Sequence, residues 1–400
     1  MRADGMGELN EYLVLEFLRE HIEATRTDLA SALSLSAASV SRIVSRLLER
    51  GMVEETTAAT STGRGRPSTV LRLVLDHTAV AGIDLGGTKC HGVLSGLDGN
   101  TIDEYRVLVQ TAGSATDALT QTWRELQTRA HARGLTIGAL AVGVPAVVDP
   151  DSGIATQGPN VGWERFDIMG HLRDFGVPFV VDNDVNLAAL AEGEFGQAQG
   201  LADYALVSIG TGLGGAVVCG GRLVRGRHNG AGELGTMIPD LGTIRHRPVG
   251  PVIGLEGILS GAAIAADARR LALAEPAAAA EFGADGLPRE VLAAAREGRP
   301  HAQALVGRVL DALALAIVNL VATTDPEVVI IDGSVGRSLE PFLDEVRDIV
   351  RLHVQVMPEI VVSVLGTNTA VRGAVSQAIT TLRQLDAPEI LTAIPSEKER

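Results

Sequence analysis

The segment Val80-Ala-Gly-Ile-Asp-Leu-Gly-Gly-Thr-Lys-Cys-His-Gly-Val-Leu94 contains two apolar runs separated by a pair of glycines. This pattern predicts two β-strands joined by a tight turn. The same layout returns at Tyr204-Ala-Leu-Val-Ser-Ile-Gly-Thr-Gly-Leu-Gly-Gly-Ala-Val-Val218. The repetition predicts a duplicated α/β lobe with one glycine-rich hairpin in each copy.

Each glycine-rich turn is a candidate phosphate site, because a turn without Cβ atoms lets backbone amides approach a phosphate closely. Asp84 is suited to hold a hydrated magnesium ion, and Thr88, Lys89 and Thr211 are suited to contact phosphate oxygens. The turn glycines that would lie against the phosphates are Gly86, Gly87, Gly212 and Gly214. One such hairpin is more often a structural turn, but one in each lobe favours a phosphate site.

Between the hairpins, Val180-Val-Asp-Asn-Asp-Val-Asn-Leu-Ala-Ala-Leu-Ala-Glu192 predicts an apolar strand whose polar end opens a helix. In one interpretation, Asp182, Asn183 or Asp184 only caps that helix. In the other, Asp184 is a general base that takes a proton from a sugar hydroxyl as this hydroxyl attacks a γ-phosphate, and Asn183 grips the sugar. The spacing is consistent with both.

The first 75 residues predict a helix, a second helix over Thr27–Leu33, a turn, and a third helix over Ser36–Arg50 with Ser36 as its N-cap. Apolar residues occupy one face of the third helix. Its other face suits a major groove, where arginine can read guanine and serine can bond phosphate. The residues of this helix that we assign to DNA binding are Ser36, Ser39, Ser41, Arg42 and Arg46.

Two further strands predict a wing, because Met52–Glu55 and Val70–Val74 flank the loop Thr62-Gly-Arg-Gly-Arg-Pro67. Arg64 and Arg66 in this loop are suited to reach DNA phosphates or the minor groove. Ser36–Arg72 holds six arginines and three acidic residues, whereas the whole chain has a net charge of −15. A local basic patch on an acidic body fits a DNA-binding head on an effector domain. The alternative is a three-helix dimerisation module with a solvated arginine face.

The composition excludes several classes of protein. Hydrophobic residues make up 46% and charged residues 21% of 400 residues, which is typical of a globular protein and not of a disordered chain. The apolar stretches Ala139–Val148 and Ala312–Leu320 are shorter than the roughly 20 residues that cross a bilayer, and the N-terminus lacks the layout of a signal peptide. We therefore expect a cytoplasmic, nucleoid-associated protein without a membrane partner. Cys90 and Cys219 are too few for a disulfide framework or a four-cysteine zinc site.

Taken together, the motifs resemble those of the ROK family (repressors, open reading frames, kinases), from about Leu9 to about Leu382. The matching segments are Asp84-Leu-Gly-Gly-Thr-Lys89, Gly143-Val-Pro145, Pro159-Asn-Val-Gly-Trp163, Asn183-Asp-Val-Asn186, Gly210-Thr-Gly-Leu-Gly-Gly215, Gly232-Glu-Leu-Gly235 and Asp325-Pro-Glu-Val-Val-Ile-Ile331. The resemblance implies an α/β fold in which a winged helix-turn-helix precedes a two-lobed, actin- and hexokinase-like sugar-kinase fold. It also implies that Asp184 is the catalytic base wherever catalysis survives, and that a sugar cleft is lined by Asn160, Asn183, Asp184, Glu233 and Glu256.

Departures from the family pattern affect the zinc and nucleotide sites. The family usually has a zinc-binding and sugar-binding His after Gly-Glu-x-Gly and then three zinc-binding cysteines, whereas this chain has Thr236 and a cysteine-free stretch, Met237–Gly254. We therefore expect no zinc, with His228 and His246 as surface residues. Ala146 stands where the family often has Gly, and Asp332-Gly333-Ser334 replaces three glycines of the adenosine-side turn. The Asp332 carboxylate would either repel nucleotide phosphates or bond a ribose hydroxyl.

We expect residues 1–76 to form the DNA-binding head, residues 77–190 the first lobe with a C-terminal helix over 373–390, and residues 191–372 the second lobe. The alanine-rich stretch Leu271–Gly298 predicts a solvent-facing insertion of helices with a loop near Phe282–Pro288. A helix over His301–Ala322 is expected to pack beneath the second sheet.

The sequence favours a sugar-responsive regulator of carbohydrate genes, a repressor, that binds a palindromic operator in double-stranded DNA as a homodimer or homotetramer. A sugar or sugar phosphate between the lobes would change its operator affinity. The rival interpretation is an ATP-dependent sugar kinase, with Mg-ATP as cofactor, that carries a DNA-binding head. A third is a sugar-binding protein whose head only mediates association.

Overall fold

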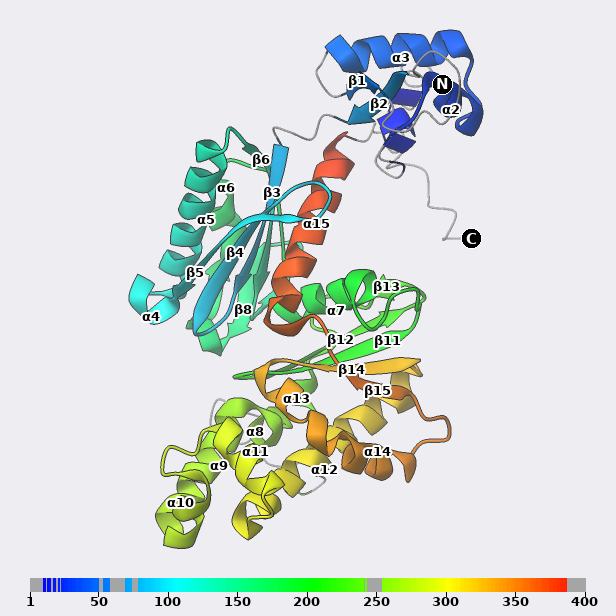
Figure 1. Cartoon of the computed structure of the whole chain (residues 1–400). Helices are drawn as coiled ribbons and strands as arrows, with labels where there is room; N and C mark the ends of the chain where they lie inside the picture. The colour runs from blue at the N-terminus through cyan, green and yellow to red at the C-terminus, as the bar shows by residue number, and fades with distance from the viewer. Residues whose placement is uncertain are drawn as a thin grey trace.

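The computed structural model of the chain describes residues 10–11, 13–15, 17–18, 21, 23–49, 53–57, 69–73, 78–240, 242 and 254–386. Figure 1 shows a small N-terminal head and two α/β lobes. Arg64, Arg66 and His246 lie outside the described residues.

The head contains α2 (Arg26–Ala32), α3 (Ala37–Glu49) and an antiparallel pair formed by β1 (Val53–Thr57) and β2 (Thr69–Leu73). A capping box opens α2, because the Thr25 side chain accepts the N–H of Asp28 while the Asp28 carboxylate accepts the N–H of Thr25 at 2.8 Å. The core of the head includes Val14, Leu18, Leu29, Val44, Leu47 and Leu71. This arrangement of helices and hairpin confirms the winged helix-turn-helix expected from the sequence.

The first lobe is built on a five-stranded sheet in the order β10-β6-β3-β4-β5. Its strands are β3 (Thr78–Leu85), β4 (Lys89–Ser95), β5 (Thr101–Leu108), β6 (Thr136–Val144) and β10 (Phe179–Asn183). Strands β3, β4 and β5 are antiparallel, and β6 and β10 are parallel to β3. A small sheet of β7 (Val147–Val148), β8 (Ile154–Gly158) and β9 (Trp163–Asp167) lies beside it, with η1 (Pro159–Val161) between β8 and β9.

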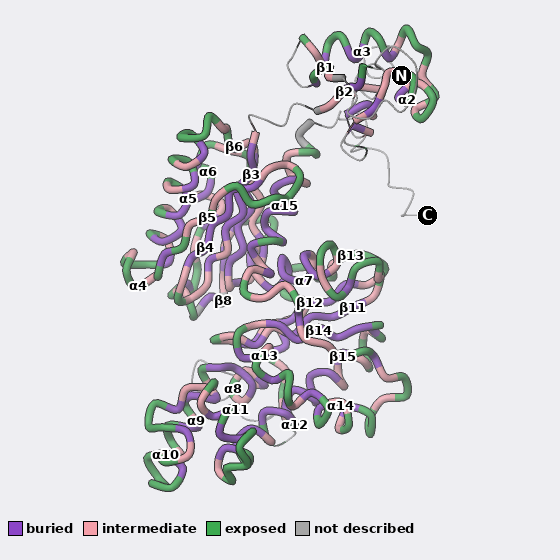
Figure 2. The backbone as a smooth tube through the Cα atoms, in the orientation of Figure 1, coloured by how far each residue is buried: buried purple, intermediate pink, exposed green. Residues whose placement is uncertain are grey.

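Helices cover both faces of the first sheet. One face packs against α5 (Ala115–Ala132), which is preceded by α4 (Val109–Ala112), and the same core includes α6 (Ile168–Arg173). The other face packs against α7 (Asp184–Phe195) and α15 (Thr369–Asp386). Figure 2 shows the buried strands between these helices.

The second lobe repeats this topology, with strand order β13-β12-β11-β14-β15. Its strands are β11 (Tyr204–Ile209), β12 (Leu213–Cys219), β13 (Arg222–Leu223), β14 (Val328–Asp332) and β15 (Glu359–Val362). Its helices are η2 (Leu234–Thr236), α8 (Glu256–Leu259), α9 (Gly261–Ala274), α10 (Pro276–Phe282), α11 (Pro288–Arg296), α12 (Pro300–Thr324), α13 (Ser334–Ser338), η3 (Glu340–Phe342), α14 (Leu343–Arg351) and η4 (Gly366–Asn368). Each sheet is an antiparallel three-stranded meander extended by two parallel strands, which confirms the duplicated lobe.

The alanine-rich stretch departs from the sequence expectation. Its helices and the loop between Phe282 and Pro288 form as expected, but the stretch is not a solvent-facing insertion. Ala278 and Phe282 of α10 and Val291 and Leu292 of α11 are buried in the core of the second lobe. Low sequence complexity misled the prediction because small alanines let the helices pack closely.

Helix α12 crosses beneath the second sheet, as expected. Among the described helices it is the one long and apolar enough to cross a membrane by length and composition. Its residues Leu305, Val309, Leu313 and Ile317 are buried in the same cluster as β11 and β14, so the helix serves here as a core element.

Helix α7 connects the two lobes and is fixed by a close crossing with α15. A Cβ atom added to Gly373 of α15 would lie 1.9 Å from the carbonyl oxygen of Leu187 in α7. A Cβ atom added to Gly82 of β3 would lie 2.7 Å from the backbone nitrogen of Val375 in α15. Leu187 packs with the first sheet, whereas Val185 of the same helix packs with the second.

We expect Gly373→Ala to destabilise the chain by about 1–3 kcal/mol, because the added methyl group would force α7 and α15 apart. Gly307→Ala on α12 is the matched control, since a Cβ atom at Gly307 meets nothing within 4 Å. This control should stabilise the helix by up to about 1 kcal/mol. Urea unfolding measures the free energy of unfolding of both variants. Equal changes in this free energy for Gly373→Ala and Gly307→Ala would contradict the close crossing of α7 and α15.

Candidate functional site

A cleft with a cavity of about 340 Å³ lies between the lobes. It is bordered by both glycine-rich hairpins, the start of α7, η1, η2, α8, and the turns before α13 and α15. The cleft brings together all the residues that the sequence assigned to sugar or phosphate: Asp84, Gly86, Gly87, Thr88, Lys89, Asn160, Asn183, Asp184, Thr211, Gly212, Gly214, Glu233, Glu256 and Gly333.

Sequence reasoning missed part of the lining. Arg337 of α13, Gly366 and Thr367 of η4, and Thr369 at the start of α15 also line the cleft. The available signal was a polar and glycine-containing segment after a strand of a parallel pair, where open α/β sheets commonly bind ligands.

Two partly buried carboxyl groups lie in the cleft. Burial raises the pKa of Asp84 to about 6, an effect that Lys89 opposes and Asp332 reinforces. Burial, together with the charges of Asp84 and Glu233, raises the pKa of Asp184 to about 7. A carboxyl that titrates near neutral pH can accept a proton from a substrate hydroxyl, so Asp184 has the properties of a general base.

The residues at the polar end of β10 cap α7 and line the cleft. Asn183 caps α7, because its Oδ1 accepts the N–H groups of Val185 at 2.9 Å and Asn186 at 3.4 Å. Its amide nitrogen donates to the carbonyl oxygen of Ala146 at 3.4 Å. The capping interpretation therefore holds for Asn183, while the Asp184 side chain lines the cleft.

Asp182 is buried under the cleft floor. Its Oδ1 accepts the N–H of Asn183 at 2.8 Å and the side-chain amide of Asn186 at 2.9 Å. Its Oδ2 is paired with the guanidinium of Arg225. These contacts hold the strand-to-helix junction that carries Asp184.

The two lobes lie close together at Gly212. A Cβ atom there would lie 2.6 Å from Oε1 of Glu256 in the second lobe and 3.1 Å from Nδ2 of Asn160 in the first. Oε1 of Glu256 accepts the N–H of Leu213 at 3.2 Å. A side chain at position 212 would therefore meet the ends of two flexible side chains, both of them candidate sugar contacts.

Asp332 is neutralised by a neighbouring cation. Nη1 of Arg337 lies 2.6 Å from Oδ1 of Asp332 and donates to the carbonyl oxygen of Gly366 at 2.9 Å. The pairing weakens the repulsion that a free carboxylate would exert on phosphates. Gly333 has φ +87°, and a Cβ atom there would lie 2.3 Å from the carbonyl oxygen of Ile209, so this turn position needs glycine.

A segment after β13 reaches across to the first lobe, and we call its residues Arg225, Arg227 and Asn229 the interlobe clasp. Arg225 pairs with Asp182. Both terminal nitrogens of Arg227 lie 3.1 Å from Oδ2 of Asp151, and Nδ2 of Asn229 donates to the carbonyl oxygen of Val148 at 3.0 Å. No motif in the sequence marked these contacts.

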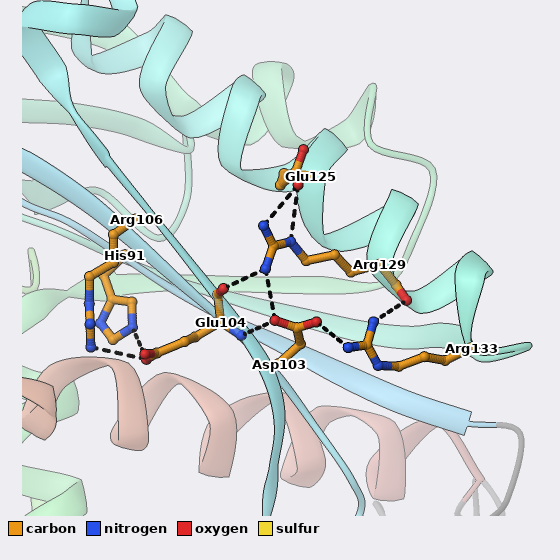
Figure 3. A network of polar contacts seen from close by, with 7 residues as sticks. All are labelled: His91, Asp103, Glu104, Arg106, Glu125, Arg129 and Arg133. Carbon is orange, nitrogen blue, oxygen red and sulfur yellow. Dashed lines mark hydrogen bonds and ion pairs between the residues drawn. The ribbon is translucent and has the colours of Figure 1, made fainter.

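A polar network on the first lobe joins α5, β4 and β5 (Figure 3). Arg129 of α5 donates to Asp103 at 2.8 Å and to Glu125 at 2.9 Å, and Arg133 also pairs with Asp103. Nearby, Glu104 contacts buried His91 at 3.1 Å and Arg106 at 3.0 Å. Nη2 of Arg106 then donates to Oδ1 of Asn368 in η4 at 3.2 Å.

The structure describes the region of the family's zinc position only in part, because residues 241 and 243–253 lie outside the described ranges. The Thr236 hydroxyl donates to the carbonyl oxygen of Glu233 at 2.8 Å and so closes its own turn. Cys90 lies in the core of the first lobe, where burial raises its pKa to about 12, and Cys219 ends β12. Among the described residues, no three His, Cys, Asp or Glu side chains are grouped to hold a metal ion.

The third helix of the head presents part of its predicted face to solvent. Ser41, Arg42 and Arg46 are exposed. Arg46 lies 3.3 Å from Glu11 in an ion pair that leaves about half of its side chain accessible. The Ser36 hydroxyl accepts a hydrogen bond from the backbone N–H of Ser39 at 3.2 Å, so Ser36 is the N-cap of α3.

Comparison with known proteins gives two family matches, the ROK family over residues 80–381 and the MarR family over residues 7–64. A xylose repressor from Caldicellulosiruptor bescii is 26% identical over 354 residues, 86% of this chain and 87% of that protein. A solved ROK family transcriptional regulator, a homologue of the E. coli MLC protein, is 24% identical with a TM-score of 0.76 and covers 96% of this chain and 100% of its own. A ROK family glucokinase from Streptomyces griseus, solved with glucose and AMPPNP, is 25% identical with a TM-score of 0.65. The match covers 76% of this chain and 99% of the glucokinase chain.

The raised pKa of Asp184 has a consequence for stability. A carboxyl whose pKa is higher in the folded than in the unfolded chain adds stability at low pH, and this stability is lost as the pH rises through the folded value. For Asp184 the loss falls between pH 3.8 and about 7. We therefore expect Asp184→Asn to be more stable than the wild type at pH 8, by about 1–3 kcal/mol, and nearly equal to it at pH 4.

Asp103→Asn is the control with the opposite sign, because the hydrogen bond from Arg129 lowers the pKa of Asp103. That variant should lose stability at pH 8. Thermal unfolding at both pH values distinguishes the two cases. If Asp184→Asn is less stable than the wild type at pH 8, the pKa of Asp184 is not raised in the folded protein.

Proposed function

The chain belongs to the ROK family, and from this premise we propose that it is a transcriptional repressor whose affinity for an operator is set by a sugar bound between its lobes. The observation that carries the proposal is the combination, in one chain, of a winged head that exposes arginines on α3 and a cleft that gathers the candidate sugar residues. The xylose repressor and the MLC homologue support it, because both matches span most of this chain.

On the DNA side, α3 enters the major groove with Arg42 and Arg46 towards the bases and Ser41 towards the backbone. Arg64 and Arg66 in the wing loop contact phosphates or the minor groove. A homodimer or homotetramer would place two heads on a palindromic operator in the cytoplasm, with residues 1–76 as the head.

On the sugar side, Asn160, Asn183, Glu233 and Glu256 would hold hydroxyl groups of a sugar or sugar phosphate between the lobe of residues 77–190 and 373–390 and the lobe of residues 191–372. Glu233 follows the interlobe clasp by four residues, so a ligand bound at Glu233 would favour the clasped arrangement. Coupling of about 1–3 kcal/mol between sugar and DNA is enough for regulation and needs only different sugar affinities in the two lobe arrangements.

A second candidate is an ATP-dependent sugar kinase with a fused DNA-binding head. It is favoured by the two hairpins, Asp84 and Asp184 meeting in one cleft, and by the neutralisation of Asp332. Asp184 would take the proton from the sugar hydroxyl, and Thr88, Lys89 and Thr211 would bind phosphates. Mg-ATP, when bound, would supply the γ-phosphoryl group, with Asp84 towards the magnesium ion and Gly333 in the adenosine-side turn.

For DNA binding, we expect Arg42→Ala to weaken operator affinity about tenfold or more, because a base contact by arginine contributes about 1–3 kcal/mol. The site is found by genome-wide mapping of bound DNA and then used in fluorescence anisotropy. Arg296→Ala on α11 is the control, since it removes an equal charge from an exposed position of the second lobe. If both variants bind the mapped site equally well, Arg42 does not read DNA.

For the effector, we expect at least one sugar in a panel of pentoses, hexoses and amino sugars to change operator affinity at least about fivefold. The same panel in an ADP-release assay separates sensor from kinase. Turnover that Asp184→Asn abolishes favours the kinase, whereas sugar binding without turnover favours the repressor alone. An operator affinity that no sugar changes would refute the effector mechanism.

A further inference from the structure

Beside the cleft lies a second cavity of about 530 Å³, which we call the annex. Its first-lobe wall includes Asp149, Thr156 and Arg165, and its second-lobe wall includes His228, Glu233 and Thr236. Its volume falls within the range of about 300–1,000 Å³ that is typical of small-molecule sites.

The annex and the cleft share Glu233 and Thr236, so the two cavities meet at these side chains. The Thr236 hydroxyl is bound to the carbonyl oxygen of Glu233 at 2.8 Å. This bond holds a short side chain against its own turn, where a longer residue would extend into the space between the cavities. A ligand in the cleft can therefore continue past Glu233 into the annex.

The annex offers hydrogen-bonding groups that the protein itself leaves unused. Arg165 on β9 is exposed, and its guanidinium forms no hydrogen bond or ion pair with any other residue that the structure describes. His228 is also exposed and makes no hydrogen bond within the described part of the chain. Asp149, by contrast, already accepts the N–H of Ser152 at 2.7 Å and its hydroxyl at 2.8 Å.

These groups match a neutral sugar ring better than an anion or an apolar group. Planar donors such as the guanidinium of Arg165 can donate hydrogen bonds to two neighbouring hydroxyls, while the carboxylates of Asp149 and Glu233 can accept hydrogen bonds from hydroxyls. The carboxylates on the same walls offset the positive charge of Arg165, which disfavours a strongly anionic occupant.

We propose that the ligand of this protein is a saccharide of at least two rings, with one ring in the cleft and the next in the annex. The inference rests on the proposed sugar-responsive function and specifies the class of effector. Since each lobe supplies one wall of the annex, the second ring contacts both lobes. It therefore adds to the preference for the clasped arrangement and strengthens the effect on operator affinity.

Isothermal titration calorimetry on the full chain tests the proposal. The probes are glucose, xylose and N-acetylglucosamine and their disaccharides cellobiose, maltose, xylobiose and diacetylchitobiose. We expect at least one disaccharide to bind about tenfold or more tightly than its own monosaccharide, as hydrogen bonds to charged groups allow. The same disaccharide should change operator affinity more than the monosaccharide does.

Variants then locate the second ring. Arg165→Ala should reduce the ratio of disaccharide to monosaccharide affinity about tenfold, and Thr236→His, which fills the passage, should reduce it too. Arg173→Ala is the matched control, an exposed arginine of the first lobe on α6 that does not line the annex. The control should leave the ratio unchanged.

Two results overturn the annex but leave the proposed function intact. In one, a monosaccharide binds and no disaccharide binds more tightly than its own monosaccharide. In the other, a disaccharide is preferred but Arg165→Ala behaves as Arg173→Ala does. If none of these sugars binds at all, both the annex and the sugar-responsive function are refuted.

Discussion

Helix α7 lies between the two sheets, and the geometry of the cleft depends on how closely this helix crosses α15. Gly373 allows α15 to touch the backbone of α7 at Leu187. The Asn183 cap and buried Asp182 fix where α7 begins. Because the helix starts at the end of a strand of the first lobe and packs on the sheet of the second, its first residue, Asp184, lies where both lobes meet. The burial that follows from this position raises the pKa of Asp184.

The cleft gathers several carboxyl groups. Asp84, Asp184 and Glu233 all have pKa values raised by burial, and neighbouring carboxylates add to the shift for each. Lys89 opposes the shift at Asp84, and Arg337 neutralises Asp332. A cleft rich in acceptors suits sugar hydroxyls, which can donate to every one of these carboxyl groups. Phosphates are suited to the hairpin side, where backbone amides, Lys89 and Arg337 are found.

The lobes also interact through the interlobe clasp, whose contacts differ in the energy they contribute. Arg225 pairs with a buried carboxylate, so its loss would leave Asp182 without its cation. The Arg227–Asp151 pair is largely exposed and adds little stability by itself. His228 and Gly230, which lie in the same segment as the clasp, also line the annex, so the clasp and the annex are neighbours.

The sequence by itself determined the duplicated lobe and the winged head, because glycine turns, strand periodicity and caps are local properties of the chain. The candidate sugar residues followed from the resemblance to the ROK family, and the residues assigned to sugar or phosphate make up part of the cleft lining. The sequence could not decide that Asn183 caps α7, since that depends on which way the side chain points; in the structure Asn183 caps the helix and, like Asp184, also borders the cleft. Nor could it place Ala278 and Phe282 in a core, pair Arg337 with Asp332, or reveal the clasp and the annex. These features depend on how helices and lobes pack, which no local pattern of residues specifies. The clasp joins Arg225 to Asp182 across the two lobes, and α10 is buried because it packs against the other helices of the second lobe.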